Sequence, residues 1–292
     1  LLGSWVEVDN GDHLAALWDI ASGKRIFARS LQYNCDEVGF TPDGREVWAG
    51  RAFWPIEGNT PVRSLPNTPS NSDYDSAAIS PDGRWHVGGS QSGDISFWEV
   101  ASGRLVDHVA PSVAAPRQIE FSNDGTTMLA NFGEAGYATG NSRRKFSALF
   151  TFAPHQAIAH PDRPPLVAEG ILSADGANLA VHNGLSGLRQ MRISEGRLIE
   201  AHQLAVGSTN RHSGRDHIPM AFDASTTRLI AGSYRLSTKL NLEWSPDSVA
   251  HDPAVIYDTQ TGKVATTLTP EAPEGVLSVA LSPDGTLAAT GV

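Results

Sequence analysis

The sequence has a single cysteine, few basic residues and no long apolar run, and each scarcity excludes a class of protein. Cys35 is the only cysteine, so no disulfide can form within the chain, which fits the cytoplasm but leaves the compartment open. Lysine and arginine number 22 against 32 aspartate and glutamate residues, a formal net charge of −10. Nucleic-acid-binding domains are normally basic, so we expect no nucleic acid as partner. No segment approaches the roughly 18 apolar residues of a membrane-spanning helix, so we expect no membrane either.

Helical periodicity is also missing, whereas residues that form turns are common. The 292 residues include 28 glycines and 18 prolines. Closed all-β folds often reach this length as one domain, so we expect a single all-β domain over residues 1–292. The chain opens without an initiator Met, a basic segment or an apolar signal segment. We therefore expect a fragment of a longer protein.

Residues 74–110 contain the pattern from which the rest of the chain can be read. Four short apolar runs are separated by Ser80-Pro81-Asp82-Gly83, then by Gly89 and Gly93, then by Ser102-Gly103. Proline presets the φ of a type I turn, and glycine accepts the positive φ that follows. Runs punctuated in this way predict a four-stranded antiparallel sheet. Because one such sheet cannot bury both its faces, the pattern predicts an array of repeats.

Two signals alternate along the chain in one order. The turn tetrapeptide recurs with five close copies and one degenerate copy, beginning at Thr41, Ser80, Ser122, Ser173, Ser282 and, for the degenerate copy, Asp223. An aromatic residue beside an acidic one marks the third strand at Trp18-Asp19, Trp98-Glu99 and Tyr257-Asp258, with weaker copies at Phe53–Ile56, Leu149–Phe152 and Gln190–Ile193. A Ser-Gly or Thr-Gly turn and a fourth strand follow each strong copy.

This combination resembles the WD-repeat (WD40) family, in particular its bacterial-type members, where the Ser-Pro-Asp-Gly turn and a Trp-Asp-x-x-x-Gly-Lys ending are frequent. The resemblance covers essentially the whole chain and implies a β-propeller built from four-stranded antiparallel blades. The family's Gly-His pair before the first strand appears in no copy here. We therefore do not expect the buried Asp-His-Ser/Thr-Trp network of many members, and apolar packing must hold the blades together.

Complete blades are expected at five places, with a partial blade at each end. The complete blades are 32–58, 74–109, 116–160, 166–204 and 217–269, and the partial ones are 1–31 and 276–292. In the first partial blade, Leu1–Ser4 matches Val87–Ser90, the end of a second strand, and strands three and four follow. The last supplies strands one and two, so joining both ends would use strand two twice. We expect part of a ring of about seven blades, within the four to eight of known propellers; a six-bladed ring with a redundant N-terminal segment is the alternative.

Long insertions interrupt only one set of connections, those from strand two to strand three and those between blades. They are 59–73, 133–145, 161–165, 205–216 and 235–252. These connections share one face of a propeller, and binding residues concentrate on loops held by a rigid scaffold. We therefore predict a partner-binding face there. Its candidate residues are Arg143, Arg144, Lys145, Arg211, His212, Arg215, His217, Lys239 and Trp244.

Arginine and aromatic side chains are favoured anchors at interfaces, so the expected partner is a protein or peptide, with acidic or phosphorylated peptides fitting best. The resemblance implies a non-catalytic scaffold, which would suit fusion to a signalling or enzymatic domain outside these residues. The segment His212–His217 has metal-ligand residue types, but its spacing matches no established site. We expect no metal and no cofactor. The turn aspartates, which recur in every repeat, are interpreted as turn formers.

The alternative is an enzyme or small-ligand-binding propeller, of hydrolase, lactonase or sensor type, with its site at the mouth of the central channel. Such a site needs ionisable side chains converging from several first strands. Asp75, Arg117 and His217 lie near first strands but differ in type and stand alone. No Gly-x-Ser-x-Gly elbow and no phosphate-binding glycine loop occurs. We therefore favour a protein that is not an enzyme.

Overall fold

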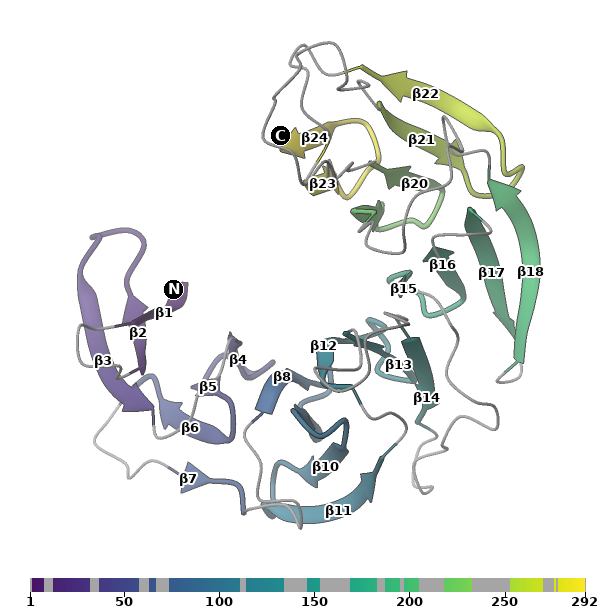
Figure 1. Cartoon of the computed structure of the whole chain (residues 1–292). Coiled ribbons are helices and arrows are strands. Elements are labelled where there is room, and N and C mark those ends of the chain that lie inside the picture. Colours follow the sequence, from purple (N-terminus) through teal and green to yellow (C-terminus); the bar gives the residue numbers. More distant parts are fainter. Residues whose placement is uncertain are drawn as a thin grey trace, which may run out of the picture. The chain divides into compact units, whose positions relative to one another are not determined.

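The computed structural model describes residues 2–7, 13–31, 37–57, 63–66, 74–110, 114–133, 146–152, 169–182, 187–194, 197–204, 218–232, 253–269, 276 and 278–291. In these ranges every regular element is a β-strand, and strands that follow one another within a sheet are paired (Figure 1). The all-β class is thus confirmed. The chain divides into two compact units, Leu1–Ala138 with Ala148–Pro165, and Thr139–Ser147 with Leu166–Val292.

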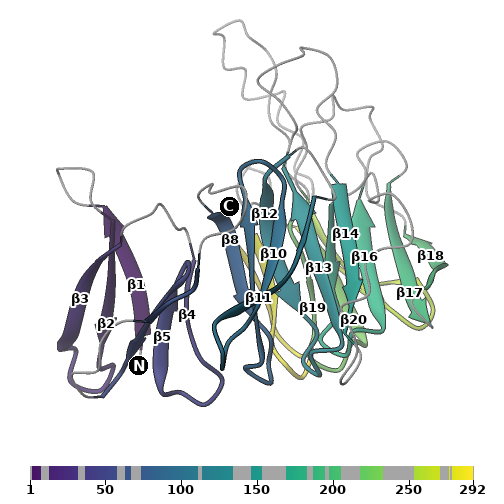
Figure 2. The ribbon, with the colours of Figure 1, turned by 90° about the horizontal axis from the view of Figure 1, so that it is seen from below.

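The first unit holds the first three sheets and most of the fourth, and each sheet follows the order of the chain (Figure 2). The first sheet contains β1 (Leu2–Glu7), β2 (His13–Trp18) and β3 (Arg25–Leu31). The second contains β4 (Val38–Phe40), β5 (Glu46–Ala49), β6 (Ala52–Pro55) and β7 (Arg63–Ser64). The third contains β8 (Tyr74–Ile79), β9 (Trp85–Ser90), β10 (Ile95–Glu99) and β11 (Arg104–Val109). The fourth contains β12 (Pro116–Phe121), β13 (Thr127–Phe132) and β14 (Phe146–Thr151).

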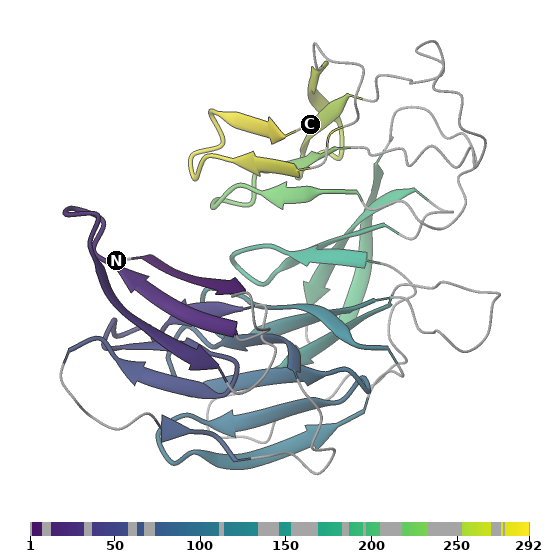
Figure 3. The ribbon, with the colours of Figure 1, turned by 60° about the vertical axis from the view of Figure 1, so that its left-hand side comes forward.

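The second unit holds the remaining three sheets. The fifth sheet contains β15 (Glu169–Leu172), β16 (Asn178–His182), β17 (Leu188–Ser194) and β18 (Arg197–Leu204). The sixth contains β19 (Met220–Phe222), β20 (Arg228–Ala231), β21 (Ala254–Asp258) and β22 (Val264–Leu268). The seventh is the hairpin of β23 (Ser278–Leu281) and β24 (Ala288–Gly291), coloured yellow in Figure 3.

The two terminal sheets both contain a strand in the second position of the repeat. In the first sheet, Leu2 of β1 pairs with Trp18, as His86 pairs with Trp98 in the third sheet. The predicted match of Leu2 to Gly88 was therefore two residues out of register, because β1 continues through Glu7. At the other end, β24 follows the first-to-second turn and pairs with β23.

The second sheet differs from its predicted extent. Its fourth strand, β7, lies beyond residue 58 and inside the segment 59–73 that was predicted as an insertion. Arg63 explains the position, because its guanidinium binds both carboxylate oxygens of Glu46 (2.6 and 3.1 Å) and donates to the Val100 carbonyl (2.8 Å). The same group lies 4.1 Å from the centroid of the Phe53 ring. These contacts hold a two-residue strand that has no apolar pattern of its own.

Each turn between a first and a second strand is closed by the same hydrogen bonds. In Ser80–Gly83, the Ser80 hydroxyl donates to Asp82 (2.5 Å) and accepts from the N–H of Trp85 (2.9 Å), while the N–H of Gly83 donates to the Ser80 carbonyl (2.8 Å). Gly83 has φ of 71°, which favours glycine. The hydroxyl bonds recur in the turns that begin at Thr41, Ser122, Ser173 and Ser282.

A bulge accompanies the third-strand aromatic residue. The pairing between third and fourth strands shifts register between Leu17 and Trp18, Phe97 and Trp98, Gln190 and Met191, and Ile256 and Tyr257. A bulge bends a strand and increases its twist. The recurrence of the bulge at one repeat position shows that the sheets share local geometry as well as sequence.

Apolar side chains on both faces of the third strands pack the sheets of a unit together. Trp98, with no exposed surface, packs with Trp48 and Phe53 of the second sheet. On the opposite face, Phe97 contacts Phe150 of the fourth sheet, with 5.6 Å between ring centroids. A strand enclosed on both faces buries most of its side chains, as β10 does from Ile95 to Trp98.

Candidate functional site

The nine candidate partner-binding residues lie outside the described residues. So do most or all residues of the five predicted insertions. The structure describes the strands that carry three of these insertions. Segment 133–145 joins β13 to β14, segment 205–216 joins β18 to β19, and segment 235–252 joins β20 to β21. Each of them therefore connects a second strand to a third or one sheet to the next, as predicted, and leaves its sheet at the end opposite the tight turns.

The opposite sheet ends carry acidic residues that are occupied by turn hydrogen bonds. Asp19 accepts from the N–H (2.8 Å) and the hydroxyl (2.7 Å) of Ser22, and the Ser102 hydroxyl donates to Glu99 (2.7 Å). The two hydrogen bonds from Ser22 lower the pKa of Asp19 below its usual value. In the last tetrapeptide, hydrogen bonds from the Ser282 hydroxyl and from Thr286 lower the pKa of Asp284 to about 2. The interpretation of these acids as turn formers agrees with this geometry.

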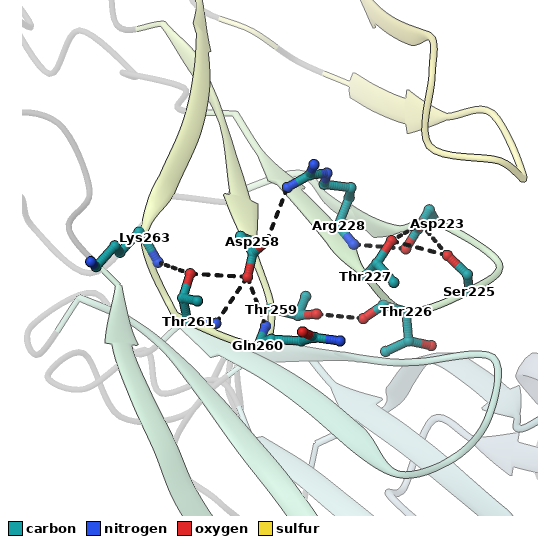
Figure 4. A network of polar contacts seen from close by, with 10 residues as sticks. All are labelled: Asp223, Ser225, Thr226, Thr227, Arg228, Asp258, Thr259, Gln260, Thr261 and Lys263. Carbon is teal, nitrogen blue, oxygen red and sulfur yellow. Dashed lines mark hydrogen bonds and ion pairs between the residues drawn. The ribbon is translucent and has the colours of Figure 1, made fainter.

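The degenerate turn of the sixth sheet keeps the same bonds with its two polar residues exchanged (Figure 4). Asp223 stands where the other turns have serine or threonine, and Ser225 stands where they have aspartate. The Ser225 hydroxyl donates to Asp223 (2.6 Å), and the N–H of Arg228 donates to the other Asp223 oxygen (2.8 Å). Burial raises the pKa of Asp223, but the hydrogen bonds from Ser225, Arg228 and Thr227 outweigh it, so the pKa is lowered overall.

A second set of bonds in Figure 4 joins this turn to the turn between β21 and β22. Arg228 lies 3.3 Å from Asp258, and the Thr259 hydroxyl donates to the Thr226 carbonyl (2.5 Å). Asp258 also accepts from Thr261, whose N–H (2.9 Å) and hydroxyl (2.9 Å) lie at one carboxylate oxygen. Asp223 and Asp258, the two acidic groups of the network, both have partners within the turns, so the network has a structural role in joining the two turns.

An unpredicted polar cluster lies where β9 turns into β10, at the sheet end from which the insertions leave. His108 Nδ1 lies 2.9 Å from the Ser96 hydroxyl, and its Nε2 lies 3.8 Å from Asp94. The Ser92 hydroxyl donates to the second Asp94 oxygen (2.6 Å). No sequence pattern indicates this cluster, because His108 belongs to a different strand and only strand register brings it opposite Ser96.

These are the residue types of a nucleophilic triad, but the geometry does not make one. Ser96 is 1% exposed, so its hydroxyl has no access to a substrate. The 3.8 Å between His108 and Asp94 exceeds hydrogen-bond length. The cluster instead joins a fourth strand to a third through the Ser96–His108 contact, and it is a different arrangement from the network of the Gly-His pair. It anchors the end of β11 against β10.

His86 of β9 is the most deeply buried titratable group of the third sheet. Its ring contacts Trp48, Phe53 and Trp98, with centroid distances of 5.4, 5.5 and 5.7 Å. Burial lowers the pKa of His86 to about 3, with a further lowering by the guanidinium groups of Arg63 and Arg51 and an opposing effect of the Gly50 backbone. His86 is therefore a neutral core residue at neutral pH.

Within the ranges that the structure describes, no group of three or more His, Cys, Asp or Glu side chains could hold a metal ion. No helix in those ranges is long and apolar enough to cross a membrane. No protein-family model matches the sequence, and no curated protein matches it. Of the channel-mouth candidates, Arg117 is exposed on β12, the side chain of Asp75 is not described, and His217 lies outside the described residues, as do Cys35 and the segment His212–His217.

Proposed function

We propose that the chain is a non-catalytic interaction module, a WD-repeat β-propeller that binds a protein or peptide through its long loops. The observation that carries this proposal is that the recurring motifs and the long segments lie at opposite ends of the sheets. The acidic and hydroxyl residues of the recurring motifs bond within their own turns, as at Ser80–Gly83 and Asp258–Lys263. The long segments leave from the opposite sheet ends, where they are free to differ from repeat to repeat.

The ring arrangement is part of the proposal. Support comes from the described residues, which form seven sheets in chain order. Three of the four-stranded sheets also share a bulge between their third and fourth strands. A ring of about seven blades fits this order, and six blades with a redundant β1 is the alternative. The third strand β10, with Trp98 packed on one face and Phe97 on the other, suits radially stacked sheets.

The partner that fits best is an acidic or phosphorylated peptide. The loops 133–145 and 205–216 contain Arg143, Arg144, Arg211 and Arg215 on a chain of net charge −10. Arginine binds carboxylate and phosphate oxygens in bidentate fashion, which gives both affinity and orientation. A basic loop face on an acidic body would also steer such a peptide to the loops.

The test is peptide capture by a variant in which these four arginines are replaced by alanine. We expect it to lose binding to an immobilised set of acidic and phosphorylated peptides and to keep the native melting temperature. The matched control replaces Lys24, Arg45, Arg104 and Arg192, four exposed basic residues away from these loops. The control has the same charge change and should bind as the unaltered protein does. Equal binding by the loop variant, or no binding by the unaltered protein, would reject the proposal.

A further inference from the structure

The fourth strands of the sheets differ in how they are protected against pairing with another chain. Each is the last strand of its sheet, so one of its edges has no neighbouring strand within that sheet. Charged residues are a common protection of such edges, because an added strand would have to desolvate them. Protected strands are β3, with Arg25, β11, with Arg104 and Asp107, and β18, with Glu200.

The strand β22 lacks this protection. Its residues Val264–Leu268 include no charge and no proline, and all but Leu268 are exposed, with Val264 at 49%. Leu268 packs against a core cluster and anchors the strand to the sixth sheet. Valine and threonine favour extended backbone, so β22 presents a regular edge. Of the described fourth strands, only the two-residue β7 is shorter than β22.

The pairing of β21 identifies which amides point outward. The N–H of Thr259 donates to the Thr227 carbonyl, so Tyr257 and Val255, in alternate positions, also bond toward β20. The residues between them, Ile256 and Ala254, bond toward β22, where their partners are Thr266 and Leu268. Thr267 lies between these partners. Its N–H and C=O therefore face the open edge.

We propose that β22 accepts an extended peptide segment of a partner protein as an additional antiparallel strand. Strand addition derives its affinity from main-chain hydrogen bonds and needs only a short regular edge. A second copy paired through the same edge would use the five residues of β22, far fewer than the roughly 20–30 residues a side of a stable interface. The exposed Lys263 would lie beside the C-terminal end of the added strand, which favours acidic residues there. This surface is separate from the long loops, so the inference stands apart from the proposed function.

The probe is a labelled peptide of alternating valine and threonine that ends in two glutamates. We expect saturable binding in fluorescence anisotropy, together with slower hydrogen exchange of the Thr267 amide in the unaltered protein. Thr267→Pro removes the outward N–H and should weaken binding at least about tenfold, the effect of losing one good hydrogen bond. Thr267→Val keeps the N–H and should bind as before. Lys263→Glu should weaken binding of this peptide but not of one that ends in two lysines.

Three outcomes would overturn the inference. The first is peptide binding without protection of Thr267, and the second is undiminished binding by a Thr267→Pro variant with a native melting temperature. The third is concentration-dependent dimerisation of the free protein that protects Thr267, which would assign the edge to a second copy. If Thr267→Pro fails to fold, Thr267→Glu, which keeps the N–H and adds an edge charge of the same sign as the probe, replaces it and should also weaken binding. The variant without the four loop arginines should still bind this probe, so failure of one idea is distinguishable from failure of the other.

Discussion

Acidification from pH 7 to pH 5 should destabilise the protein through His86. The folded state holds the pKa of this group at about 3, against 6.5 for an ordinary histidine. Because the folded pKa is lowered, the unfolded chain binds a proton below pH 6.5 that the folded protein refuses until about pH 3. The contribution of neutral His86 to the free energy of unfolding is fully present above pH 6.5 and falls as the pH drops from 6.5 toward about 3.

The size of the effect follows from the distance between the two pKa values. Each pH unit inside the window changes the free energy of unfolding by about 1.4 kcal/mol for one proton. At pH 5, about 1.5 units below the ordinary value, His86 alone should therefore cost about 2 kcal/mol. Most carboxylates remain ionised at pH 5, so acids such as Asp284 add little over this range.

Urea unfolding at pH 7 and pH 5 measures this loss directly. His86→Leu removes the titrating ring and fills a similar volume against Trp98, so it should shrink the difference between the two pH values by about 2 kcal/mol. Ile95→Val, a mild change in the same sheet without a titrating group, is the control and should keep the full difference. If His86→Leu and the unaltered protein lose the same stability between pH 7 and pH 5, the reasoning about His86 is wrong.

Two further predictions concern the turns. Thr226 has φ of 59° where the other turns have glycine, and its buried Oγ1 has no hydrogen-bond partner among the described residues, so Thr226→Gly should raise the free energy of unfolding by about 1 kcal/mol. Thermal melting would show it, and a lower melting temperature would contradict it. Ser80→Ala should lower the free energy of unfolding by about 1–2 kcal/mol in urea, because the N–H of Trp85 loses its acceptor. Ser92→Ala, an exposed hydroxyl beside Asp94, is the control and should cost less.

Much of the fold could be predicted because its determinants are local. The Ser80–Gly83 pattern encodes its own hydrogen bonds, and the alternation of turn and aromatic signals sets the order of the strands. Features that depend on partners distant in sequence escaped prediction. β7 forms because Arg63 reaches Glu46 and the Val100 carbonyl, and neither contact is written in the residues around it.

The candidate site was less accessible from sequence. The Ser96–His108 contact depends on the register of β10 and β11, and this register includes a bulge between Phe97 and Trp98. The nine loop residues were chosen by position and residue type, and they lie outside the described residues, so the partner-binding face stays a prediction. Loops of this length take their conformation from tertiary contacts and from partners, which a single sequence does not specify.

The exchange of Asp223 and Ser225 has a consequence for how such repeats diverge. The exchange itself takes two of the substitutions that separate this turn from its sister turns, and the order of these two matters. An intermediate with aspartate at both positions would press two carboxylates together in a site where Asp223 is 1% exposed. An intermediate with serine at both keeps a neutral hydroxyl pair at hydrogen-bond distance. Evolution from one form to the other should therefore pass through a turn with serine at both positions. A sequence search for degenerate repeats should accordingly include Ser-x-Ser as well as both orders of serine and aspartate.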